Sequence, residues 1–132
     1  MLKIVYCVRR NPSLSREEFL RYWLDEHGPL VRSLRESVPS MVRYVQSHTI
    51  EGPQTDAVRA SRGSGEPYDG ITEVWIDASR DGAGDRAGHR AGDRAGDPEA
   101  SAEAGRHLLE DEAKFIDFAN SSVFVTEEHE IF

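Results

Sequence analysis

Cysteine is almost absent from this sequence, which contains Cys7 alone among 132 residues. A single cysteine can form neither an intrachain disulfide nor a cysteine-based zinc site. We interpret Cys7 as a small buried residue of a strand. Long apolar runs are missing too: residues 2–8 are apolar but end at Arg9, and no signal-peptide cleavage pattern follows. We therefore expect a cytoplasmic protein with no membrane partner.

Basic residues are in short supply, with 16 lysines and arginines against 24 aspartates and glutamates and a formal net charge of −8. Nucleic-acid binding needs a basic surface, so this balance argues against a nucleic-acid partner. Phosphate-binding glycine loops and serine–histidine–aspartate elbows are also absent. His27, His48 and Glu73 could ligate a metal, but no close spacing such as H-x-x-x-H supports it. We expect no metal and no cofactor.

The patterns that are present predict one domain over residues 1–132. Its order is β-α-β-β-α-β, which predicts an α+β ferredoxin-like fold with a four-stranded antiparallel sheet and two helices on one face. The predicted strands cover residues 2–9, 41–50, 68–77 and 122–132, and the helices cover residues 15–36 and 99–118.

The first helix has the clearest local signals. Ser15 and Glu18 form a capping-box pattern at its start. Trp23 and His27 lie one turn apart on its apolar stripe. Gly28-Pro29 follows, and a residue before proline is disfavoured in a helix. The sequence therefore predicts a helix to about residue 26, a break at His27, and a shorter helix to about residue 36.

Two segments look like flexible loops. Residues 51–67 are rich in glycine, proline, serine and charge, which predicts a long surface loop. Residues 79–98 contain tandem AGDR and AGHR units, and each glycine would cost a helix about 1 kcal/mol. We interpret this second segment as a low-complexity insertion rather than a basic docking strip.

The strands predict a partner. The two helices would cover one sheet face only, yet strands 2–9 and 68–77 are apolar on both faces. A second copy of the chain, packed sheet to sheet, would bury the remaining face. We therefore predict a homodimer.

Five segments together resemble the EthD family: LSREEFLRYWLDEHGPLV, RYVQSHT, YDGITEVWID, LLEDEAKFID and FVTEEHEI. The resemblance covers nearly all of the chain outside residues 52–66 and 79–102. It implies a dimeric α/β barrel in which two ferredoxin-like sheets close on one another. It also implies one of two roles: a small cofactor-independent enzyme acting on polyketide or aromatic intermediates, or a protein that accompanies an oxygenase. The histidine of the family's H-G-P motif corresponds to His27.

His27, Glu73 and His48 are the predicted catalytic residues. An imidazole can accept and return a proton near neutral pH. His27 could instead only cap the broken helix. Glu73 lies between the apolar Ile71 and Trp75, where a carboxyl group tends to have a raised pKa and can act as an acid. It could instead form an intersubunit ion pair.

Trp23, Tyr44, Trp75 and Tyr6 are the predicted substrate-binding residues. Tyr44 shares one strand face with His48, so the two could line the same elongated pocket. Trp23 and Trp75 would form apolar walls. Asp111 falls within the apolar stripe of the second helix, and we expect it to border the stripe and face water.

These residues support three hypotheses. The first is a cofactor-free acid–base enzyme of the lyase or isomerase type, which dehydrates, cyclises or decarboxylates a small aromatic or polyketide-like carbonyl compound. The second is a non-catalytic small-molecule-binding accessory to an oxygenase pathway. The third is a purely structural dimer with a filled core.

Overall fold

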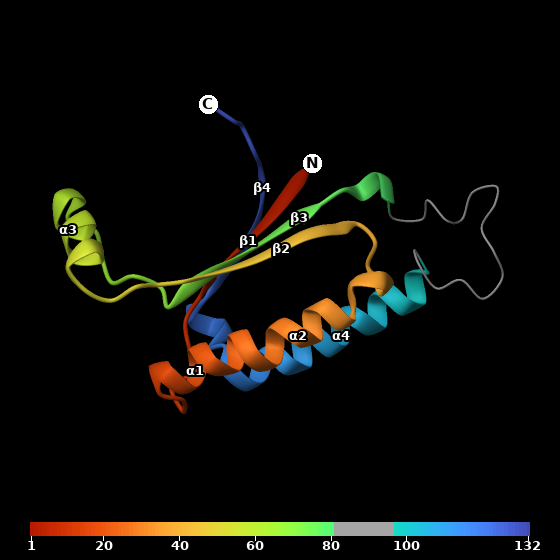
Figure 1. The fold of residues 1–132 in the computed structure, drawn as a ribbon, viewed down its shortest axis with the longest axis horizontal. Coiled ribbons are helices and arrows are strands. Elements are labelled where there is room, and N and C mark those ends of the chain that lie inside the picture. Colours follow the sequence, from red (N-terminus) through yellow and green to blue (C-terminus); the bar gives the residue numbers. More distant parts are fainter. Residues whose placement is uncertain (81–96) are drawn as a thin grey trace.

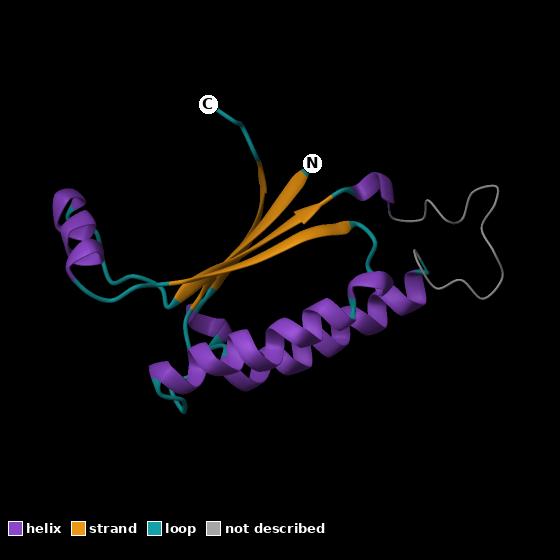
Figure 2. Ribbon diagram, in the orientation of Figure 1, coloured by secondary structure: helices purple, strands orange, loops and turns teal. Residues whose placement is uncertain are grey.

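The computed structural model describes residues 1–80 and 97–132. It has a four-stranded antiparallel sheet with helices packed against one face (Figure 1, Figure 2). The strands are β1 (Leu2–Val8), β2 (Met41–His48), β3 (Gly70–Ile76) and β4 (Ser122–Glu127). The helices are α1 (Arg16–Tyr22), a π-helical turn (Trp23–His27), α2 (Gly28–Ser33), α3 (Pro53–Arg62) and α4 (Pro98–Phe115).

The strands lie in the order β2-β3-β1-β4, and each neighbouring pair is antiparallel. The α1–α2 unit connects β1 to β2, and α4 connects β3 to β4 (Figure 1). Both connections cross the same face of the sheet. This arrangement confirms the predicted α+β ferredoxin-like fold.

The start of α1 is as predicted. The Ser15 hydroxyl accepts a hydrogen bond from the Glu18 backbone N–H at 3.1 Å, and the Glu18 carboxylate accepts one from the Ser15 N–H at 2.9 Å. This capping box satisfies two backbone donors of the first turn.

The predicted break after His27 is wrong, because the backbone stays helical through it. His27 has φ −70° and ψ −40°, and Gly28 has φ −55° and ψ −53°. In a regular helix the ring of Pro29 would collide with the carbonyl four residues earlier. The chain makes a wider π-helical turn instead, in which the Gly28 N–H donates to the Trp23 carbonyl. Gly28 has no Cβ, which relieves the crowding that normally keeps a pre-proline residue out of a helix.

The prediction of a loop over 51–67 is wrong as well, because α3 occupies most of it. Pro53 is the first helical residue, and Gly63 ends the helix with φ 57°. Proline and glycine suggested a loop, but at these two places they begin and end a helix. α3 buries no residue and stands apart from the other helices (Figure 1). Most of the other predicted loop, 79–98, lies outside the described residues.

α4 starts one residue earlier and ends three residues earlier than predicted. The Asp97 side chain caps it by accepting from the Glu99 N–H at 2.9 Å, and Pro98 occupies the first position. Ile116 follows with φ −104° and ψ 136°, so the chain leaves the helix in an extended conformation.

The core is a cluster of buried aromatic and aliphatic side chains at one end of the sheet. Phe19 contacts Trp23 at a centroid distance of 5.4 Å and Phe115 at 5.9 Å. The Trp23 ring packs directly beneath Gly70 of β3. A Cβ on Gly70 would lie 2.6 Å from that ring and 2.5 Å from the Ser47 carbonyl oxygen. The absence of a side chain at this position lets the helix layer approach the sheet closely.

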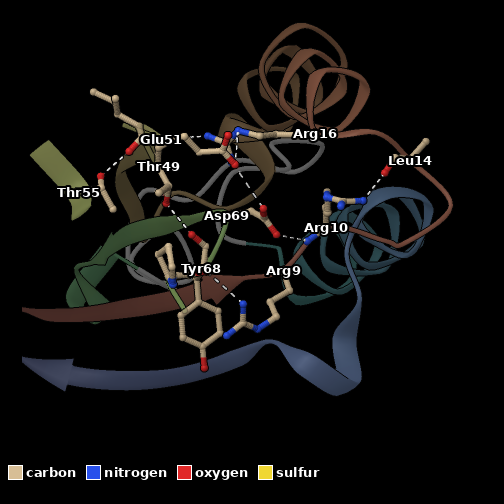
Figure 3. A network of polar contacts seen from close by, with 11 residues as sticks. Arg9, Arg10, Leu14, Arg16, Thr49, Glu51, Thr55, Tyr68 and Asp69 are labelled. Carbon is tan, nitrogen blue, oxygen red and sulfur yellow. Dashed lines mark hydrogen bonds and ion pairs between the residues drawn. The ribbon is translucent and has the colours of Figure 1, made fainter. Parts of the chain in front are cut away.

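Asp69, just before β3, fixes the ends of three elements together (Figure 3). Its carboxylate accepts a hydrogen bond from the Arg10 N–H at 2.8 Å and lies 3.6 Å from the Arg16 guanidinium. Arg16 also donates to the Thr49 carbonyl, and Thr49 donates to the Tyr68 carbonyl at 2.7 Å. The ends of β1 and β2, the start of α1 and the start of β3 therefore share one polar network.

Alternation along the strands sorts the side chains onto two faces. The helix-covered face carries Val8 and Tyr6 of β1, Gly70 and Thr72 of β3, and Tyr44, Gln46 and His48 of β2. The open face carries Lys3, Val5 and Cys7 of β1, Ile71, Glu73 and Trp75 of β3, and Phe124 of β4.

The close approach at Gly70 yields the first prediction. We expect Gly70→Ala to lower the free energy of unfolding by about 2 kcal/mol, because the new methyl group would overpack Trp23 and the β2 backbone. Urea denaturation measures this loss. Gly105→Ala in α4 is the matched control: its Cβ would meet nothing within 4 Å, so we expect a gain of about 0.5–1 kcal/mol. Equal midpoints for wild type and Gly70→Ala would contradict the proposed packing constraint.

Candidate active site

His27 is buried between the α1–α2 unit and α4, with 4 % of its surface exposed. Its Nδ1 lies 2.8 Å from the Asp111 Oδ2 of α4, and its ring packs against Phe115 at a centroid distance of 5.0 Å. Asp111 also accepts a hydrogen bond from the Tyr22 hydroxyl and lies 3.5 Å from Lys114 Nζ. The structure thus contains a buried histidine–carboxylate pair. It also overturns the expectation that Asp111 faces water.

The electrostatics of this pair favour a neutral imidazole beside an ionised carboxylate. Burial lowers the pKa of His27, and the attraction of Asp111 only partly opposes it. Burial raises the pKa of Asp111, but hydrogen bonds from Tyr22 and His27 outweigh that effect and lower it overall. At neutral pH the neutral ring therefore donates its Nδ1–H to Asp111, which leaves the lone pair on Nε2.

Nε2 is the ring nitrogen of His27 that could accept a proton from a substrate. Among residues 1–80 and 97–132, no group forms a hydrogen bond with His27 Nε2. In this part of the chain, every fully buried side-chain nitrogen or oxygen atom does have a hydrogen-bond partner. Nε2 is therefore not fully buried. A neutral ring that is held by a carboxylate at Nδ1, with an Nε2 that no described residue pairs, has the arrangement of a general base.

Glu112 is a second carboxyl group of α4 in the helix layer, and the sequence analysis did not single it out as a site residue. It follows Asp111 on α4 and is half-buried. Burial, together with the Asp111 charge, raises its pKa to about 7. Its charge also acts on the phenols of Tyr6 and Tyr44 across the helix-covered sheet face. Burial raises the pKa of Tyr6 to about 12, so this phenol keeps its proton.

A cleft of about 870 Å³ opens between the helix layer and β2. A space of this size holds a ligand of drug-like dimensions. From the helix side it is lined by Leu24, Gly28, Pro29, Val31, Arg32 and Arg35, and from β2 by Met41, Val42, Arg43, Tyr44 and Gln46. Tyr44 is the predicted site residue that lines the cleft. His27 is not among the lining side chains, although its neighbour Gly28 is.

Gln46 links the cleft to the buried residues behind it. Its amide nitrogen donates to the Trp23 carbonyl at 2.8 Å and to the Tyr44 hydroxyl at 3.1 Å. The Trp23 carbonyl is also the acceptor of the π-helical turn that carries His27. Tyr44 accepts the hydrogen bond from Gln46, and its hydroxyl group also lies next to Trp23 and Thr72. Burial raises the pKa of Tyr44, against hydrogen bonds from Gln46, Trp23 and Thr72, so it is a neutral phenol at physiological pH.

His48 and Trp23 hold this arrangement in place. Their rings stack at a centroid distance of 4.6 Å and an interplanar angle of 14°. His48 Nε2 lies 2.9 Å from the Gln46 side-chain oxygen, which can only accept, so Nε2 carries the hydrogen. Burial and the nearby Arg16 lower the pKa of His48, which keeps it neutral. Trp23 is 1 % exposed and belongs to the core.

Glu73 and Trp75 lie on the other face of the sheet and are not brought together with His27 in this chain. Glu73 forms an ion pair with Lys3 at 2.7 Å. Lys3 and Arg43 lie over the Trp75 ring at 5.1 Å and 4.5 Å, and the Trp75 Nε1–H donates to Glu128. The alternation of β3 places Glu73 and Trp75 on the face opposite Thr72.

Two further features concern metals and membranes. In the described part of the chain, no three histidine, cysteine, aspartate or glutamate side chains gather as ligands for a metal ion. Among the helices of residues 1–80 and 97–132, none is both long and apolar enough to cross a bilayer.

The fold and motif match known proteins. The family model described as the EthD domain matches residues 11–119. An ethyl tert-butyl ether D (EthD) family protein from Bacillus halodurans is 16 % identical, with a TM-score of 0.54 over 98 % of this chain and 99 % of that chain. HapK from Hahella chejuensis is 12 % identical, with a TM-score of 0.54 over 98 % and 93 %.

A dimeric ferredoxin-like protein of unknown function from Thermobifida fusca is 11 % identical, with a TM-score of 0.51 over 96 % of this chain and 90 % of that chain. These identities establish a common fold and carry no activity with them. Among curated proteins, none matches the chain.

The raised pKa of Glu112 makes stability depend on pH in a defined direction. Between the ordinary value of 4.5 and about 7, the folded state binds this proton more tightly than the unfolded state does. Stability therefore falls as pH rises through this window and stays lower above it. We expect Glu112→Gln to exceed wild type by about 2 kcal/mol above pH 7, and the gain to disappear below about pH 4.5.

Urea denaturation across this pH range measures the effect. Glu110→Gln, at an exposed position of the same helix, is the matched control and should follow the wild-type curve. A Glu112→Gln curve parallel to wild type at every pH would mean that the Glu112 carboxyl group is not destabilised by burial.

Proposed function

The chain belongs to the EthD family, as its sequence motifs predicted, and we propose that it is a cofactor-independent acid–base enzyme acting on a small aromatic or polyketide-like carbonyl compound. The reaction would be a dehydration, cyclisation or decarboxylation. The observation that supports this most is the buried His27–Asp111 pair, with its 2.8 Å contact, in the layer behind a large cleft.

For dehydration or cyclisation, the proposed chemistry starts with proton removal. His27 Nε2 takes a proton from the carbon beside the substrate carbonyl, and Asp111 stabilises the imidazolium that forms. The electron pair of the broken C–H bond moves into the carbonyl group and gives an enolate. Tyr44 donates its O–H to the enolate oxygen, where negative charge develops. Expulsion of a leaving group or attack on a second carbonyl then completes the reaction, and the imidazolium returns its proton. In a decarboxylation the electron pair of the broken C–C bond would form the enolate as CO₂ leaves, and the enolate carbon would then take up a proton.

Glu112 would be the second acid or base of this site. A carboxyl group with a pKa of about 7 is present in both protonation states at neutral pH. It can therefore deliver a proton to a leaving hydroxyl group and take one up afterwards. Tyr6, on which the Glu112 charge acts, would contact the substrate on the sheet side. His48 would position Gln46, and through it Tyr44.

The alternative function is a non-catalytic small-molecule-binding accessory to an oxygenase pathway. It is favoured by one observation: His27 is not among the side chains that line the cleft. In that case the His27–Asp111 pair would only join the α1–α2 unit to α4. The two functions differ in whether a bound carbonyl compound exchanges protons with solvent.

We also propose that the chain is a homodimer whose open sheet faces meet. Apolar side chains of the open face include Val5, Ile71 and Phe124, and Phe124 is 46 % exposed in the single chain. No helix of the described residues covers this face (Figure 1). The related Thermobifida fusca protein is described as dimeric. A second copy would remove this apolar area from water.

The enzymatic proposal is tested by proton exchange. We expect the protein to accelerate deuterium incorporation next to the carbonyl of aryl ketones or aryl β-diketones in deuterium oxide, followed by proton NMR. His27→Gln should slow exchange by about a hundredfold or more. Asp111→Asn should slow it less and shift the lower limb of the pH–rate profile to lower pH, because Asp111 raises the pKa of His27.

His107→Gln is the control, because this histidine is exposed on α4 and its ring lies 3.9 Å from the Glu103 carboxylate. It should leave exchange unchanged. A His27→Gln variant that is folded and exchanges protons at the wild-type rate would exclude His27 as the base. Binding of carbonyl compounds without exchange by any variant would favour the accessory role.

The dimer proposal has its own test. We expect Phe124→Glu to shift the protein from dimer to monomer, because each dimer would bury two carboxylates in the apolar interface. Analytical ultracentrifugation measures the mass. Val58→Glu, on exposed α3, should stay dimeric. A wild-type protein that sediments as a monomer would overturn the proposal.

A further inference from the structure

We propose that the cleft between the helix layer and β2 binds the carboxylate of an aromatic acid through Arg32 and Arg35. This inference rests on the proposed function in one respect only: it takes the occupant of the cleft to be the substrate. It adds the class of that substrate, an aromatic or conjugated carboxylic acid.

The first support is the charge of the cleft wall. The chain as a whole is acidic, with a net charge of −8. Three of the cleft-lining residues are nevertheless arginines, namely Arg32, Arg35 and Arg43, and none of the lining residues is acidic. If the cleft lining had the average composition of this chain, it would contain more carboxylates than guanidinium groups. The charge of the cleft lining is therefore positive, opposite in sign to the net charge of the chain.

The second support is that two of these arginines are uncommitted. Neither Arg32 nor Arg35 forms an ion pair with any described residue. Within residues 1–80 and 97–132 they also donate no hydrogen bond to a carbonyl, as they would if they only capped the end of α2. Arg43 differs, because its guanidinium lies over the Trp75 ring at 4.5 Å.

The spacing of the two free arginines suits one planar anion. They are three residues apart, at the end of α2 and in the 3₁₀ turn Arg35–Ser37, so they project from neighbouring positions of one helical surface. A guanidinium group binds a carboxylate through two parallel hydrogen bonds.

The rest of the cleft suits an apolar ring system. Leu24 is 57 % exposed and lines the cleft, together with Val31, Met41 and Val42. An exposed leucine at a cleft wall offers apolar surface that a ligand would cover. Tyr44 and Gln46 supply polar groups on β2. A ligand with its carboxylate on the arginines could therefore lay its rings on the apolar wall and direct a carbonyl oxygen toward Tyr44.

The test compares an acid with its neutral ester. Naphthoate and methyl naphthoate share the same rings and differ in the negative charge, so their binding by isothermal titration calorimetry isolates anion recognition. We expect naphthoate to bind more tightly. Arg32→Gln and Arg35→Gln should each weaken naphthoate binding by about tenfold and leave the ester unaffected.

Arg62→Gln on α3 is the control, because it removes the same charge from a distant surface and should leave both affinities unchanged. The proposal is overturned if neither compound binds, if the ester binds as tightly as the acid, or if the double variant Arg32→Gln/Arg35→Gln keeps wild-type affinity for naphthoate.

Binding and proton exchange, measured on the same protein samples, separate this proposal from the proposed function. Arginine-dependent binding of naphthoate without any proton exchange would support the anion site and refute the enzyme. Proton exchange without preference for the acid would support the enzyme and refute the anion site.

Discussion

The position of Trp23 is the constraint on which the rest of the structure depends. Its ring fits beneath Gly70 and stacks on His48, and its carbonyl accepts from both Gly28 and Gln46. These contacts fix the helix against the sheet at one end. They also hold the π-helical turn, whose last residue, His27, contacts Asp111 of α4. The turn that carries His27 and the cleft-lining side chain of Gln46 are both hydrogen-bonded to this one residue.

Much of the fold could be predicted from the sequence, because its signals are local. The capping box at Ser15, the alternation in β1 and β3, and the apolar stripe of α4 each specify one element and one buried face. Gly28-Pro29 shows where local reasoning stops. The penalty before proline is real, but a π-helical turn and a glycine remove it at lower cost than breaking a helix that is anchored on both sides.

The candidate site was less predictable, because its residues are far apart in the sequence and contact one another only in the folded chain. The His27 motif identified one half of the pair, whereas Asp111 lies 84 residues away and looked like the polar border of a stripe. The acidic pair Asp111-Glu112 within an otherwise apolar stripe was the available signal. For Glu73 the strand pattern correctly predicted the face of the sheet but not the partner. Lys3 forms an ion pair with Glu73, and this pairing depends on the register of β1 against β3, which the sequence alone did not reveal.

Asp111 and Glu112 show how adjacent carboxylates in one helix acquire different chemistry. Asp111 receives hydrogen bonds from Tyr22 and His27, so burial costs it little and it stays ionised. For Glu112, burial and the Asp111 charge both act in the same direction and raise its pKa to about 7. One carboxylate can therefore orient a base, while the other can exchange a proton. Two groups whose surroundings separate their pKa values are what a cofactor-free proton transfer requires, and here a single turn of α4 provides both.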